Sequence, residues 1–145
     1  MTEFTSEVQT IPHKVGSVYE VLSDLSNLEL VKDRVPADKI KGFSFDKDSC
    51  TFNVSPVGDI KFQIIDRQVN DTIKFQGMQL PMEVYMWIQL KESGDETKLK
   101  LTVKADLNVF LKPMVSKPLS EGIEKVASLL VTLPYDDILE KRQGK

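Results

Sequence analysis

Side chains that could carry acid–base or metal chemistry are scarce in this sequence. The single histidine, His13, directly follows Pro12 in an expected loop, and we interpret it as a solvent-exposed polar residue rather than a general base. Asp136 and Asp137 are adjacent carboxylates, and adjacent residues on a helix point in different directions, so we interpret them as a solvated helix end. Because we find no His/Cys/Asp/Glu group with metal-ligand spacing and no Gly-rich phosphate loop, we predict no catalytic residue, metal site or cofactor.

The single cysteine, Cys50, cannot form an internal disulfide, which suits a reducing compartment. It lies in the strand-like run Ser49 to Val54, where alternate residues are apolar. We therefore interpret Cys50 as a small buried hydrophobic residue rather than a reactive thiol.

The residues that suggest a function are apolar, and they fall on the predicted inner face of a sheet and on one long helix. Small-molecule pockets are mostly apolar with a few placed polar groups, and Gln79 is the best polar candidate on an inward row. For the apolar residues, plain core packing is the alternative. Our candidate ligand-binding residues are Phe52, Phe62, Phe75, Gln79, Met86, Ile88, Leu101, Val103, Leu119, Gly122, Ile123 and Val126.

Two details favour a cavity over a filled core. Gly122 lies inside the predicted helix, where glycine costs about 1 kcal/mol relative to alanine, so it either leaves room for a ligand or allows a strand to approach closely. Met78, Met82, Met86 and Met114 supply adaptable side chains, which suit an irregular apolar site or, alternatively, fill core gaps.

The elements that must position these residues are predicted from periodicity. Residues 3–11 favour a strand, and from Lys39 to Leu107 apolar and polar residues alternate, as in an antiparallel sheet covered on one side. Short turn signals separate the runs, for example at Asn70-Asp71 and Ser93-Gly94-Asp95. We predict a meander of about six strands plus the N-terminal one, making about seven.

Helical patterns flank this sheet. Ser17-x-x-Glu20 and Ser26-x-x-Glu29 each match a capping box, so two short helices are expected after the first strand. Residues 117–134 predict a long C-terminal helix, capped by Ser116, with Pro118 in its first turn and an end at Pro134. The apolar stripe of this helix needs a cover, and only the inner face of the sheet is large enough.

Length and composition bound the remaining possibilities. The 145 residues fit one domain, 1–145, and 41% hydrophobic with 28% charged residues is a globular composition. The net charge of -3 argues against nucleic-acid binding, and no apolar run approaches a membrane span. The N-terminus lacks the pattern of a signal peptide, so we expect a cytoplasmic protein.

One partner surface is suggested by the opposite face of the sheet. Tyr85 and Trp87 alternate with Val84 and Met86 and therefore point away from the inner face. If they are open to solvent, they suggest a homodimer contact or a protein partner. Burial beneath a neighbouring loop is the alternative.

The order of elements resembles the helix-grip fold of the START-like or SRPBCC superfamily, which includes Bet v 1-like and polyketide cyclase/dehydrase-like proteins. The resemblance is carried by Pro12, by Val18 to Asp24 followed by Leu25 to Leu28, and by the passage from Ala105-Asp106-Leu107 through Pro113 to Leu119-Ser120-Glu121-Gly122. It implies an α+β fold in which a curved antiparallel sheet wraps around the C-terminal helix. It also implies a deep cavity between them that holds lipids, sterols, polyketides or plant hormones.

We therefore expect a noncatalytic protein that binds or transports a small hydrophobic ligand of lipid, sterol or polyketide type. The resemblance leaves two alternatives: a polyketide cyclase/dehydrase-like enzyme, and an interaction module of the kind that serves as an Hsp90 cochaperone. An entirely apolar pocket favours the carrier, converging polar groups favour the enzyme, and an exposed aromatic patch around Trp87 favours the interaction module.

Overall fold

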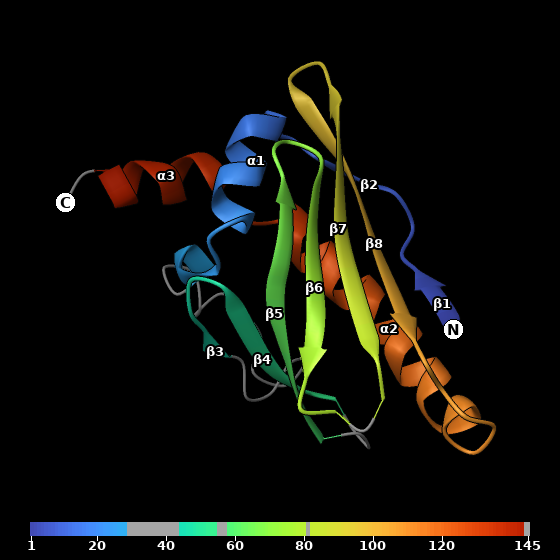
Figure 1. Cartoon of the computed structure of the whole chain (residues 1–145). Helices are drawn as coiled ribbons and strands as arrows, with labels where there is room; N and C mark the ends of the chain where they lie inside the picture. The colour runs from blue at the N-terminus through green and yellow to red at the C-terminus, as the bar shows by residue number, and fades with distance from the viewer. Residues whose placement is uncertain (29–43, 55–57, 81, 144–145) are drawn as a thin grey trace.

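A long helix crosses one face of an antiparallel sheet in the computed structural model, which describes residues 1–28, 44–54, 58–80 and 82–143 (Figure 1). Within these ranges the sheet has eight strands, in the order β1-β8-β7-β6-β5-β4-β3, with β2 also paired to β8. The strands are β1 (Thr2–Thr5), β2 (Gln9–Ile11), β3 (Ser44–Phe45), β4 (Ser49–Val54), β5 (Gly58–Gln68), β6 (Thr72–Met78), β7 (Val84–Ser93) and β8 (Glu96–Ala105).

The six strands β3 to β8 form the predicted meander, since each pairs with the next along the chain. The prediction of one N-terminal strand over residues 3–11 is wrong, because β1 and β2 are separate strands that both pair with β8. Ser6 lies at the break. Its amide donates to the Leu101 carbonyl (2.8 Å) and its hydroxyl accepts from the Leu101 amide (2.9 Å), so a side chain replaces one rung of the ladder.

The inner face of the sheet holds most of the hydrophobic core, as the alternation predicted. On β8 the inward residues Leu99, Leu101, Val103 and Ala105 are all buried. Tyr85 and Trp87 of β7 point to the outer face, opposite Lys104 and Thr102. Strand alternation thus separates an apolar interior from a polar exterior.

A β-bulge at Ile65 interrupts the pairing of β5 with β6. Ile64 pairs with Phe75, but the next pair is Asp66 with Lys74, so Ile65 has no partner in the register. An extra residue in one strand shifts every later side chain to the opposite face. The bulge therefore brings Arg67, which pairs with the inward Ile73, to the inner side of the sheet.

The first of the two predicted short helices is confirmed as α1 (Val15–Leu22), but the predicted capping residue, Ser17, is wrong. The residue before it is Lys14, which makes no side-chain capping bond, and Ser17 lies inside the helix. Residues 25–28 form a single 3₁₀ turn where the second helix was expected. Glu29 and the rest of that expected helix lie outside the described residues.

Helix α2 (Leu111–Val131) is the predicted long helix, but it begins six residues earlier than expected, since 117 minus 111 is 6. Asn108 explains the early start, because its Oδ1 accepts the amides of Phe110 (2.9 Å) and Leu111 (2.8 Å). Pro113 then occupies the first turn, where its missing donor is not needed. The prediction that Ser116 caps the helix and that Pro118 lies in its first turn is wrong: the Ser116 hydroxyl bonds the Lys112 carbonyl and Pro118 is interior.

A further helix, α3 (Tyr135–Gln143), was not predicted. It packs against α1, and its Tyr135 and Ile138 are buried in the core, so Asp136 and Asp137 begin a helix instead of ending one. Among the helices in the described ranges, none combines the length and apolarity needed to cross a membrane.

Candidate functional site

The candidate site is the interface between the inner face of the sheet and helix α2. Helix α2 runs diagonally across the sheet (Figure 1) and contacts β1, β2, β4 and β8. Its buried residues Ile123, Ala127 and Leu130 belong to the same core as the inward residues of the strands. The sheet therefore covers the apolar stripe of the helix, as the sequence required.

Seven of the predicted site residues are buried in the hydrophobic core that the sheet shares with α2. They are Phe62, Phe75, Met86, Ile88, Leu101, Val103 and Ile123. Leu119, Gly122 and Val126 lie on α2 and are half-buried. Phe52 lies in β4 opposite Ile60, and its side chain falls outside the described part of the chain.

Gln79 does not lie on the inner face, and that prediction is wrong. Strand β6 ends at Met78, and Gln79 is exposed with a φ of 57°. The chain turns there, and Leu80 folds back over Gly77: a Cβ built on Gly77 would lie 2.9 Å from Leu80 Cδ1 and 3.2 Å from Val84 Cβ. A leucine thus takes the position where a polar ligand contact was expected, because period-two alternation fails once the strand ends.

Gly122 does not serve close strand packing. A Cβ built at Gly122 would meet no atom within 4 Å, apart from the backbone of its own helix. Of the two explanations for a glycine here, the close approach of a strand is therefore wrong. Of the four methionines proposed for an apolar site, two lie at the core: Met86 is buried and Met82 packs against it. The other two do not, because Met78 pairs with the outward Lys61 and Met114 is exposed.

Every buried polar side chain in the described ranges has a structural hydrogen-bond partner. The Thr97 hydroxyl donates to the His13 carbonyl (2.8 Å), and the Thr102 hydroxyl donates to Gln89 Oε1 (2.8 Å). Asn27 Nδ2 donates to the Val21 carbonyl (3.2 Å). Each buried side-chain nitrogen or oxygen atom of the described residues therefore has at least one hydrogen-bond partner within the protein.

His13 is not simply solvent-exposed, as the sequence suggested. Its ring is half-buried edge-on against Tyr135, with centroids 5.4 Å apart, and its Nδ1 lies 3.4 Å from Asp136 Oδ2. Tyr135 is fully buried, and its hydroxyl donates to the Leu130 carbonyl (2.5 Å). Burial raises the Tyr135 pKa well above its usual value. The cluster joins the β2–α1 connection to α2 and α3, and no group of potential metal ligands occurs among the described residues.

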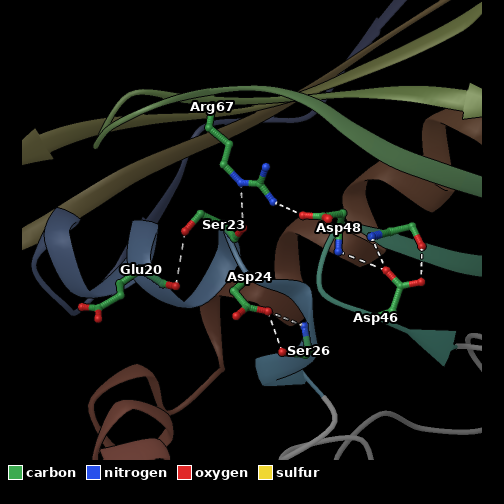
Figure 2. Close-up of polar contacts among 8 residues, drawn as sticks. Glu20, Ser23, Asp24, Ser26, Asp46, Asp48 and Arg67 are labelled. Carbon is green, nitrogen blue, oxygen red and sulfur yellow. Dashed lines mark hydrogen bonds and ion pairs between the residues drawn. The ribbon is translucent and has the colours of Figure 1, made fainter.

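A second polar cluster joins β5 to α1 and to the β3–β4 turn (Figure 2). Arg67 Nε donates to the Ser23 carbonyl (2.9 Å) and Nη2 to Asp48 Oδ1 (2.6 Å). Asp46 accepts the amides of Asp48 and Ser49 and the Ser49 hydroxyl, and this last bond lowers the Asp46 pKa. The Asp-x-x-Ser spacing of Asp46 and Ser49 is the sequence signal for the hydrogen bonds of this turn, whereas no pattern in the sequence points to Arg67.

Cys50 is buried, as predicted, on the inner face opposite Phe62. Desolvation, with a smaller contribution from the charge of Asp46, raises its pKa to about 12. The thiol is therefore protonated at neutral pH and acts as an apolar side chain.

The Tyr85/Trp87 face is partly covered by lysines. The Nζ of Lys74 lies 5.1 Å from the centroid of the Tyr85 ring and 5.4 Å from that of Trp87, and Lys104 Nζ lies 5.6 Å from the Trp87 ring. Both aromatics are half-buried, so neither ring is fully open to solvent. Among the described residues, the lysine ammonium groups lie over the two rings as cation–π partners. A partner at this face stays a prediction.

Known proteins were compared with the chain by sequence and by structure. No protein-family model and no curated protein matches the sequence. Among solved structures, the protein TTHA0849 of Thermus thermophilus superposes with a TM-score of 0.63 at 15% identity, covering 97% of this chain and 99% of its own. Norcoclaurine synthase of Thalictrum flavum gives 0.60 at 13% identity, covering 87% and 86%.

A START superfamily protein of Mycobacterium smegmatis also matches, with a TM-score of 0.52 at 11% identity over 88% of this chain and 98% of its own. At such identities the likeness is one of fold. The α+β architecture, the antiparallel sheet and the long helix against it agree with these structures. The resemblance predicted from the sequence is therefore confirmed at the level of fold: the chain has a START-like, helix-grip fold.

Proposed function

We propose that this protein binds a small hydrophobic ligand between the inner face of its sheet and helix α2, without catalysing a reaction. The observation that carries the proposal is the chemistry of that interface. Its described residues are apolar on both sides, and the buried polar side chains nearby already have partners within the fold. Such a lining suits an apolar guest and offers no converging donors or acceptors for acid–base work.

Gly122 supports a ligand site between the sheet and helix α2. It interrupts the helix surface between Leu119 and Val126, where any other residue would project a side chain, and a Cβ there would meet no neighbour within 4 Å. A helix former would be more stable at this position by about 1 kcal/mol, so the glycine has a cost that space for a ligand would explain.

The test compares Gly122→Leu with Gly16→Leu. Both glycines lie in helices and have no atom within 4 Å of a built Cβ, but Gly16 is on the exposed side of α1. We expect a fluorescent fatty acid to bind the wild type and Gly16→Leu alike, whereas Gly122→Leu stays folded and binds about tenfold more weakly or worse, since its side chain competes for the space. Equal affinity of all three folded proteins would contradict the proposal.

The position of Trp87 gives this titration an internal check. The only tryptophan points to the outer face, among Lys74 and Lys104. A ligand held between sheet and helix leaves its emission nearly unchanged. Strong quenching of Trp87 on saturation would instead place the ligand on the outer face.

A further inference from the structure

We draw no further inference here: the strongest candidate, the exposed apolar patch of Val109, Phe110 and Met114 where β8 passes into α2, carries no proposal, because the lysines beside it are balanced by Glu3, Asp106 and Glu121 and nothing in the described residues shows what covers it.

Discussion

Individual residues whose types could carry chemistry serve the fold in the structure. His13 contacts Tyr135 and Asp136, and so joins the β2–α1 connection to α3. Tyr135 is buried, and its hydroxyl satisfies a carbonyl near the end of α2. The sequence does not reveal these structural roles, because the two contacting residues are far apart along the chain. His13 and Asp136, for example, are separated by 123 positions.

Cys50 supplies a prediction at this scale. Its pKa is raised by burial from 9.0 to about 12, so the folded protein holds the thiol proton more tightly than the unfolded chain does. This contribution to stability is complete below pH 9 and is lost as the pH rises from there toward 12. Between about pH 8 and about pH 10, the free energy of unfolding of the wild type should fall by about 1 kcal/mol more than that of Cys50→Ala.

Denaturant titrations of both proteins at the two pH values measure this difference. Ellman's reagent is a second readout: the native thiol should react only on the time scale of unfolding. Parallel pH dependence of the two proteins, together with rapid labelling of native Cys50, would show that the thiol is accessible and contradict its placement on the inner face.

At the scale of the elements, sequence periodicity predicted the sheet well and the ends of elements poorly. The alternation along β7 and β8 correctly separated Met86, Ile88, Leu101 and Val103 from Trp87 and the lysines. It failed at Gln79 because the strand had already ended at Met78. It could not predict the bulge at Ile65, where the register shifts by one residue. It also could not predict the early start of α2, which depends on the bonds from the Phe110 and Leu111 amides to Asn108 Oδ1.

The return of Leu80 over Gly77 supplies a prediction for the end of β6. Gly77→Ala should destabilise the protein by about 1 kcal/mol or more, because the new methyl would lie 2.9 Å from Leu80 Cδ1 and 3.2 Å from Val84 Cβ. Leu80→Ala in the same chain should recover part of that loss. The measurement is the free energy of unfolding from chemical denaturation.

Gly16→Ala is the control for this pair of variants. It places the same methyl in helix α1, where nothing lies within 4 Å, and it should stabilise the protein by roughly 0.5–1 kcal/mol through helix propensity. A Gly77→Ala protein as stable as the wild type would mean that β6 and Leu80 do not pack as described.

At the scale of the whole molecule, two surfaces of different character lie on one helix. The buried stripe of α2, with Ile123, Ala127 and Leu130, closes against the sheet, whereas its first turns expose Phe110 and Met114. The periodicity of the sequence predicted the buried stripe. Met114 was counted among the methionines suited to an apolar site or a core gap, but it is exposed in the first turns of α2, before the expected start of the helix at residue 117.

The measurement that tests the central proposal most directly is a methyl NMR titration of the protein with an apolar ligand such as a medium-chain fatty acid. Saturable shifts are expected at Ile88, Leu101, Val103 and Ile123, on both sides of the sheet–helix interface. The methyls of Val69, exposed in the β5–β6 turn, should stay unchanged. Saturable binding that shifts Val69 or the Trp87 indole while the inner methyls stay fixed would contradict the proposal.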